Sequence, residues 1–292
     1  MELRNITTFQ RAAELNSFSK TAEELGYTQS AVTIQIQQLE KELGVLLFER
    51  IGKKIRLTEE GEMFLIHARK VSDSLQAAIS SVSEHEQISG ALRIGTSESL
   101  CSHILPDIIE RYTKHYPNVQ LQIETIPVTD MKDAVLKNQI DILFFVDLPA
   151  FEKNMVRGIA VPLTHHFVTT PDNELAHKTK VPLAKILSQP LILTEKGLSY
   201  RDELERYVYG RKLQFEPRIT CDNADLLLKT VLRCGYVSYL PDFMTDELVK
   251  EEKLIRLPCE IPTQMQLQAV YHQHKQITPQ MQAFLDLLTE LE

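Results

Sequence analysis

The chain has 292 residues, 43% of them hydrophobic, and a formal net charge of −8 at pH 7. This composition supplies the cores of two or three domains and excludes a disordered protein. No run of eighteen apolar residues and no signal peptide is present, so we expect a cytoplasmic protein without membrane contact. The four cysteines lack CxxC spacing, which argues against a zinc site or a redox pair.

The first predicted elements are three short helices. Residues 3–15 form an amphipathic pattern that packs its apolar side inward, as scaffold for the two helices that follow. Ser19 is the predicted N-cap of the second helix, and Gly26 closes it at a tight corner where a left-handed residue is needed. Thr28 then caps the third helix.

The third predicted helix has a buried stripe and a polar face. The stripe consists of Val32, Ile36, Leu39 and Leu43. The other face is short and uncharged, and it suits base edges in a major groove, where Gln pairs bidentately with adenine. The predicted base contacts are Gln29, Ser30, Thr33, Ile34 and Gln37. On spacing alone, a DNA-reading helix-turn-helix and an ordinary helical hairpin with a solvated face are equally supported.

A basic hairpin is predicted next. Residues 50–56 contain no acid and four positive charges, on Arg50, Lys53, Lys54 and Arg56. In a strand over 54–57 the charges alternate with apolar residues, so the charges point outward while Ile55 and Leu57 are buried. With Gly52-Lys53 as its tip, the hairpin is a wing that neutralises phosphates, and the alternative is an ordinary solvated hairpin. The clustering matters because residues 1–60 together hold eight Lys or Arg against nine Asp or Glu.

A long helix follows, capped by Thr58 and continuing to about Glu86. Its apolar residues form a heptad seam, composed of Phe64, Ala68, Val71, Leu75, Ala78 and Val82. A narrow seam on a long helix favours pairing with a second copy, and the alternative is packing against its own domain.

The amino-terminal region closely resembles that of LysR-type bacterial transcriptional regulators. The resemblance rests on Ser17, Phe18, Ser19, Ala22, Leu25, Ser30, Ala31, Val32, Ile36, Leu39, Glu40, Leu43, Gly44, Leu47, Phe48, Arg50, Leu57, Thr58 and Gly61. It implies a winged helix-turn-helix at 1–58, a linker and dimerisation helix at 59–89 and an effector-binding domain at 90–292. Many members carry Arg where this chain has Ile34, so a basic contact is missing, and Ile34 either touches a thymine methyl or packs.

The resemblance also implies partners. Two paired linker helices place two reading heads on one DNA face, so we expect double-stranded DNA with a dyad-symmetric operator. Self-association into dimers, and of dimers into tetramers, is expected from the family, and RNA polymerase is a further expected partner.

From Ser89-Gly90 onward, strands alternate with helices, which predicts an α/β fold with mainly parallel sheets. The expected strands are 91–95, 119–126, 141–146, 156–161, 166–170, 191–193, 218–221, 236–240 and 265–271, and the clearest helices are 104–112, 130–137, 200–209, 224–233, 241–250 and 279 to the end. This order resembles the family's two-lobed effector domain, similar to type 2 periplasmic solute-binding proteins. The resemblance puts lobe 1 at about 90–161 and 265–292, and lobe 2 at about 162–264.

Two loops at strand ends are candidates for binding a small-molecule effector. Ligands of such sheets bind beyond the carboxyl ends of strands, near helix N-termini. The candidate residues are Thr96, Ser97 and Ser99 on one loop, Ser199 and Arg201 on the other, and Thr129 and Asn223 at the rim. Hydroxyls, helix N-termini and a guanidinium predict a carboxylate or another anion. The alternative is that these residues are plain N-caps and a surface Arg that pairs with a nearby acid.

No enzyme motif is found, and we expect no cofactor. His272 and His274 lie two apart on a predicted strand, but surface histidines are the better interpretation than a metal pair. The sequence therefore predicts an effector-responsive transcriptional regulator. The rival classes are a metabolic enzyme with an accessory amino-terminal module and a solute-binding protein.

Overall fold

The computed structural model describes residues 1–51, 54–82, 88–149, 153–197 and 199–291. The chain forms two compact units. The first comprises Met1–Glu86, Lys137–Gln139 and Lys275–Pro279, and the second comprises Gln87–Leu136, Ile140–His274 and Gln280–Glu292.

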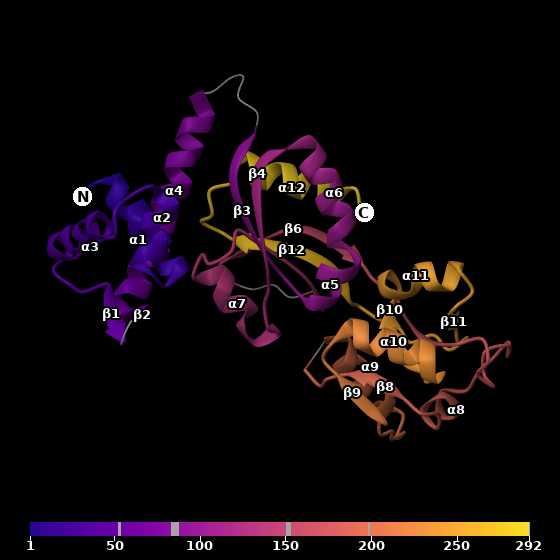
Figure 1. Ribbon diagram of the computed structural model, residues 1–292. Coiled ribbons are helices and arrows are strands. Elements are labelled where there is room, and N and C mark those ends of the chain that lie inside the picture. The colour runs from indigo at the N-terminus through magenta and orange to yellow at the C-terminus, as the bar shows by residue number, and fades with distance from the viewer. Residues whose placement is uncertain (52–53, 83–87, 150–152, 198, 292) are drawn as a thin grey trace. The chain divides into compact units, whose positions relative to one another are not determined.

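The first unit is a winged helical domain that continues into a long helix (Figure 1). Its elements are α1 (Leu3–Leu15), α2 (Phe18–Leu25), α3 (Gln29–Leu43), β1 (Phe48–Ile51), β2 (Lys54–Leu57) and α4 (Glu59–Val82). Strands β1 and β2 pair antiparallel, with Phe48 opposite Leu57. The predicted hairpin tip, Gly52-Lys53, lies outside the described residues.

Most of the predicted helix caps are confirmed in this unit. Gly26 has φ +68° and ends α2, the hydroxyl of Thr28 accepts from the Ala31 amide at 3.2 Å, and that of Thr58 accepts from the Gly61 amide at 2.9 Å. The cap of α2 was predicted wrongly. Helix α2 begins two residues earlier than expected, at Phe18, and Ser17 rather than Ser19 is its N-cap, accepting from the Lys20 amide at 3.3 Å.

Three aromatic rings form the centre of the first unit's core. Phe9 of α1 lies 5.4 Å from Phe48 and 5.1 Å from Phe64 between ring centroids, so α1 joins the wing to α4. In α3, Val32, Ile36 and Leu39 are buried as predicted. The predicted stripe is one residue too long, because Leu43 in the last turn is 36% exposed.

The heptad seam of α4 divides into two halves. Phe64 and Ala68 pack against the core of the winged domain, as the alternative interpretation required. Val71 and Leu75 are 40% and 41% exposed. The upper seam therefore presents apolar surface to solvent, while the Val82 side chain lies outside the described part.

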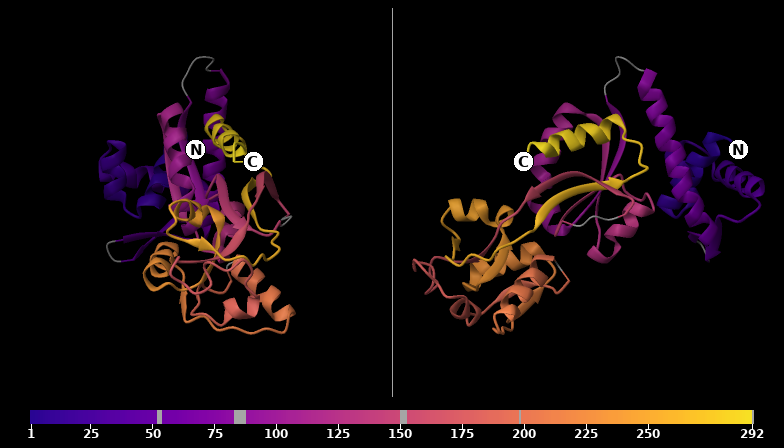
Figure 2. Two further views of the ribbon diagram at one scale, coloured as in Figure 1. Left: turned by 90° about the vertical axis from the view of Figure 1, so that its right-hand side faces the viewer. Right: turned by 180° about the vertical axis from the view of Figure 1, so that it is seen from behind.

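The second unit contains a five-stranded sheet in the order β4-β3-β5-β12-β6, which we call lobe 1 together with its helices. Its strands are β3 (Ser89–Thr96), β4 (Asn118–Thr125), β5 (Ile142–Asp147), β6 (Met155–Pro162) and β12 (Gln266–His272), and its helices are α5 (Glu98–His103), α6 (Leu105–His115), α7 (Val128–Leu136) and α12 (Pro279–Thr289). Helices α6 and α12 lie side by side (Figure 2), where Tyr112 donates to the Gln280 carbonyl at 2.7 Å. Helix α7 packs on the side of the sheet that carries Leu143 and Val270.

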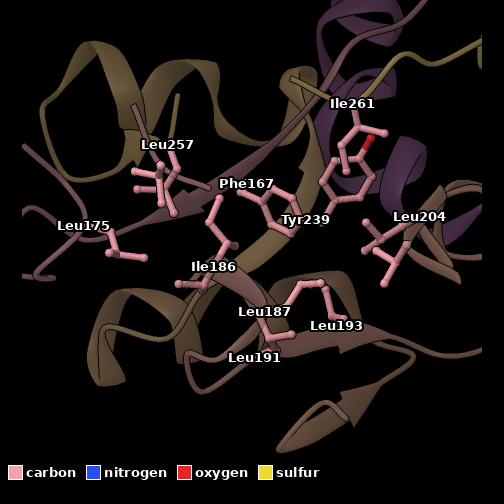
Figure 3. Packing of buried hydrophobic residues seen from close by; sticks show 13 residues of the cluster. Phe167, Leu175, Ile186, Leu187, Leu191, Leu193, Leu204, Tyr239, Leu257 and Ile261 are labelled. Atoms are coloured by element: carbon pink, nitrogen blue, oxygen red, sulfur yellow. The ribbon is translucent and has the colours of Figure 1, made fainter. Parts of the chain in front are cut away.

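The rest of the second unit, which we call lobe 2, holds two smaller sheets, β10-β7-β11 and β8-β9. Its strands are β7 (His165–Thr169), β8 (Ile192–Thr194), β9 (Ile219–Cys221), β10 (Ser238–Pro241) and β11 (Ile255–Arg256), and its helices are α8 (Leu183–Leu187), α9 (Ser199–Gly210), α10 (Ala224–Cys234) and α11 (Asp242–Lys250). Figure 3 shows its core, in which Phe167 and Tyr239 pack among leucines that include Leu193 of β8 and Leu204 of α9. The two ring centroids lie 5.0 Å apart.

The expectation of mainly parallel sheets was wrong. Strand β3 pairs parallel with β4 and β5, and β8 with β9. In contrast, β12 pairs antiparallel with both β5 and β6, and β7 pairs antiparallel with β10 and β11. The chain leaves lobe 1 after β6 and comes back as β12, and this return inserts a strand of opposite direction between two strands of the first sheet.

Candidate functional site

The polar face of α3 is exposed, and hydrogen bonds within the corner hold part of it. Gln29 accepts at Oε1 from the Ser19 hydroxyl at 3.1 Å, and the hydroxyls of Ser30 and Thr28 lie 3.0 Å apart. Gln37 is exposed, whereas Thr33 is half-buried and donates its hydroxyl to the Gln29 carbonyl at 2.9 Å. The face can therefore present amide and hydroxyl groups to a partner. Hydrogen bonds already hold the side chains of its first turn, Gln29 and Ser30, before any partner binds.

Ile34 and the wing flank this face. Ile34 is 62% exposed, so the packing alternative for it is wrong within this chain. On β2, Ile55 is 9% exposed and Arg56 points outward, as the alternation predicted. The side chains of Arg50 and Lys54, and all of Lys53, lie outside the described part of the chain.

The second candidate site is a cavity of about 490 Å³ between lobe 1 and lobe 2. Lobe 1 contributes Ser97, Glu98, Ser99, Ile126, Pro127, Val128, Met131, Lys132, Leu143, Phe145, Val146, Asp147, Met155, Arg157 and Val270, and lobe 2 contributes Thr194, Glu195, Ser199, Tyr200, Asp222 and Ala224. Its volume falls in the range of small-molecule sites.

The structure brings three of the seven predicted effector residues to this cavity, namely Ser97, Ser99 and Ser199. Thr96 is fully buried at the end of β3, and it is absent from the described lining. Thr129 and Asn223 are exposed close by, again without lining the cavity. Asn223 instead caps α10, because its Oδ1 accepts from the Leu226 amide at 2.7 Å.

Arg201 does not reach the cavity in the described structure. Its side chain is 3% exposed, its Nη2 donates to Glu205 Oε1 at 2.7 Å, and its guanidinium lies 4.9 Å from the ring centre of Phe215. The alternative interpretation, pairing with a nearby acid, is what the structure shows, although the pair is buried rather than on the surface. The i,i+4 spacing of the two residues was the sequence signal for this pair.

Glu98 is the functional candidate that sequence reasoning missed. Its Oε2 accepts from the backbone N–H of Ala224 at 2.8 Å, and its Oε1 accepts from Asn223 Nδ2 at 2.8 Å. The carboxylate of lobe 1 therefore sits at the N-terminus of α10 in lobe 2, where helix amides favour a negative charge. Because the partners are 125 and 126 positions apart, local sequence patterns could not predict this contact.

Two titratable groups are held neutral beside the cavity. The ring of His165 stacks between Tyr200 and Tyr239, with centroids 5.3 and 5.7 Å away, and burial lowers the pKa of His165 to about 4. Burial likewise raises the pKa of Tyr200, which lines the cavity, to about 12. Both side chains are therefore uncharged at neutral pH.

The predicted histidine pair has a different geometry. Strand β12 ends at His272, and the backbone N–H of His274 donates to His272 Nδ1 at 3.1 Å. The two residues form a turn instead of neighbouring positions on one strand. Within the described residues, no helix is long and apolar enough to cross a membrane.

Two family profiles match the sequence. The profile for the bacterial regulatory helix-turn-helix protein, lysR family, matches residues 3–62, and that for the LysR substrate binding domain matches residues 85–292. The uncharacterized HTH-type transcriptional regulator YwqM of Bacillus subtilis (strain 168) is 30% identical over 293 residues, which cover 98% of each protein.

Solved structures share this fold. A full-length OxyR variant from Pseudomonas aeruginosa aligns with a TM-score of 0.77 at 20% identity, covering 99% of this chain and 94% of that one. Full-length CbnR, in complex with its target DNA, aligns with a TM-score of 0.64 at 18% identity and covers 100% of both chains.

Proposed function

This chain belongs to the LysR family of bacterial DNA-binding transcriptional regulators, and an effector-binding domain follows its helix-turn-helix. We propose that the exposed face of α3 reads base edges in a major groove through Gln29, Ser30, Thr33, Ile34 and Gln37. The observation that supports this assignment is the exposure of Gln29, Ser30, Ile34 and Gln37 on one helix, in the domain that also carries the exposed Arg56 on β2. We place the protein in the cytoplasm, with access to DNA.

In this proposal the two groups of residues have different roles. Amides, hydroxyls and the Ile34 side chain discriminate between bases, because each base pair presents its own pattern of donors, acceptors and methyl groups in the major groove. The basic residues of the wing, Arg50, Lys53, Lys54 and Arg56, bind phosphates and contribute affinity that does not depend on sequence.

Binding titrations at several salt concentrations test this division. Gln29→Ala should cost about 1 to 3 kcal/mol on the operator and little on random DNA. Arg56→Ala should weaken both DNAs alike and reduce the salt slope by about 1. The matched control is Gln38→Ala, an exposed glutamine of α3 outside the predicted contacts. Equal losses on operator and random DNA for Gln29→Ala would refute the base-reading role.

We propose that two chains pair through the upper half of α4. The exposed Val71 and Leu75 support this, because a heptad seam buries such residues only against another helix. The dimer places two α3 helices on a dyad-symmetric operator, and dimers pair further into tetramers. RNA polymerase is a proposed partner of the DNA-bound assembly.

We propose that the cavity between lobes 1 and 2 binds a small anionic effector. The hydroxyls of Ser97, Ser99 and Ser199 support this, together with Lys132 and Arg157, the cationic residues of the described lining. A carboxylate held by such groups makes charge-assisted hydrogen bonds. By contacting both lobes, the effector favours one arrangement of them and so shifts the regulator between two states.

A thermal-shift screen with organic acids tests the effector site. Acids that bind should raise the melting temperature of the full chain, since a ligand stabilises the state it binds. Lys132→Gln, which removes an exposed cation from the lining, should reduce that rise. Lys178→Gln removes an exposed cation elsewhere in lobe 2 and should leave the rise unchanged. Equal responses of the two variants would contradict the anionic assignment.

A further inference from the structure

The two walls of the cavity differ in chemistry. Among the described residues, lobe 1 contributes nine large apolar residues to the lining, namely Ile126, Pro127, Val128, Met131, Leu143, Phe145, Val146, Met155 and Val270. Lobe 2 contributes mostly polar groups, including the acids Glu195 and Asp222 and the hydroxyl of Ser199. Lobe 1 also contributes both cationic residues of the described lining, Lys132 and Arg157, so a ligand that fills the cavity meets apolar surface and positive charge on the same lobe.

The apolar wall is continuous with the core of lobe 1. Met131, Leu143 and Val270 belong to a buried cluster beneath α7, and their exposed fractions are 6%, 2% and 7%. Phe145 and Met155 pack against this cluster while remaining half-buried. The cluster thus supports the outer residues of the wall from beneath.

The outer part of the wall leaves apolar surface open to solvent. Val128 is 42% exposed at the start of α7, and Pro127 before it is also exposed. Apolar side chains gathered in a concave site mark ligand binding, because burying them against an apolar group releases water. An uncharged, apolar ligand group would bury this surface favourably.

We infer that the effector is a monocarboxylate with an apolar body, such as a medium-chain, branched or aromatic acid. The inference rests on the proposed anionic site and adds the class of acid. The apolar body lies on the apolar residues of lobe 1, and the single carboxylate lies beside Lys132 and Arg157, the cationic residues of the same lobe. A ligand of this shape contacts both kinds of residue at once.

The charges of the lining disfavour a second carboxylate. In the described part of the lining, four acids, Glu98, Asp147, Glu195 and Asp222, accompany two basic residues. A dicarboxylate would place its second charge either on the apolar wall or near one of these acids, and both placements raise the free energy of the complex. Dicarboxylates should therefore bind more weakly than monocarboxylates of equal length.

Calorimetric titration of the full chain with acetate, butyrate, hexanoate, succinate and adipate tests the inference. Burying one methylene contributes about 0.8 kcal/mol, so affinity should rise about fourfold for each added methylene from acetate to hexanoate. Adipate has the length of hexanoate with a second carboxylate and should bind at least tenfold more weakly. Hexylamine, with the same apolar body and the opposite charge, completes the set.

A pair of neutral variants locates the apolar contact. Val128→Ser should lower the affinity for hexanoate about threefold or more and leave that for acetate unchanged. Leu226→Ser removes an apolar residue that is 57% exposed on α10, outside the described lining, and should change neither affinity. Because both positions are exposed, both variants should fold.

Each outcome separates this inference from the proposed function. If affinity does not rise with chain length, or if adipate binds as tightly as hexanoate, the apolar-body inference is wrong while the anionic site stands. If hexylamine binds and the acids do not, the anionic assignment is wrong, and the monocarboxylate inference that rests on it is wrong as well. If none of the probes binds, both assignments are overturned.

Discussion

Replacing Glu98 by Gln tests whether this carboxylate holds the two lobes together. In the parent chain its two oxygens accept from Asn223 Nδ2 and from the Ala224 amide, each at 2.8 Å. The substitution keeps the shape of the side chain but removes its charge. It also places an NH2 group, which can only donate, opposite either Asn223 Nδ2 or the Ala224 N–H, so one of these two donors loses its acceptor.

The expected cost follows from these two contacts. Hydrogen bonds to a charged group contribute about 1.5 to 3 kcal/mol each. Since glutamine retains one acceptor oxygen, we expect the variant to lose about 2 kcal/mol of the coupling between the lobes. A loss of that size corresponds to about a 30-fold change in an equilibrium constant.

Amide hydrogen exchange of the full chain measures this change locally. The Ala224 N–H donates to Glu98 in the parent, and its hydrogen should exchange about 30-fold faster in Glu98→Gln. The Leu227 amide serves as an internal reference, because it donates to the backbone carbonyl of Asn223 at 3.0 Å and contacts neither Glu98 nor the Asn223 side chain. Glu124→Gln, at an exposed carboxylate on β4, is the control variant. Ala224 exchange within twofold of the parent rate would refute the role of Glu98 in joining the lobes.

Three further predictions concern other parts of the chain. Gly61→Ala should destabilise the winged domain by about 3 kcal/mol in urea unfolding, because the added Cβ would lie 2.1 Å from the Leu47 carbonyl oxygen. An unchanged urea midpoint would contradict this close approach of residue 61 to the Leu47 carbonyl. The pKa of His165 is lowered from 6.5 to about 4, so between these pH values the folded state binds fewer protons than the unfolded state. The free energy of unfolding of the parent should therefore fall by about 2 kcal/mol from pH 7 to pH 5, and that of His165→Gln should fall by less. Parallel pH profiles of the two proteins would show that His165 is not the cause. Leu75→Glu should shift the chain toward monomers in light scattering at micromolar concentration, and a parent that is itself monomeric would contradict the proposed pairing.

The sequence alone determined the elements whose causes are local. Apolar residues spaced by three and four located α1, α3 and α4, since that spacing places side chains on one helix face. Gly26 and Thr28 located the corner between α2 and α3, because a left-handed residue and a capping hydroxyl act within one turn. The N-cap of α2 was misplaced because Ser17 and Ser19 both offer a suitable hydroxyl. Their residue types do not say which one precedes the helix, and the structure shows that it is Ser17.

Tertiary structure decided the features that depend on distant parts of the chain. The antiparallel insertion of β12 follows from the return of the chain after lobe 2, which strand patterns do not record. Residue types and loop positions predicted Ser97, Ser99 and Ser199 in the cavity, because each follows the carboxyl end of a strand and lies in or just before the first turn of a helix, where ligands of such sheets bind. They misassigned Arg201, whose direction was set by Glu205 and Phe215. The apolar wall and the Glu98 contact arise only when separate segments fold together, because burial and pairing across the lobes are set by packing in three dimensions.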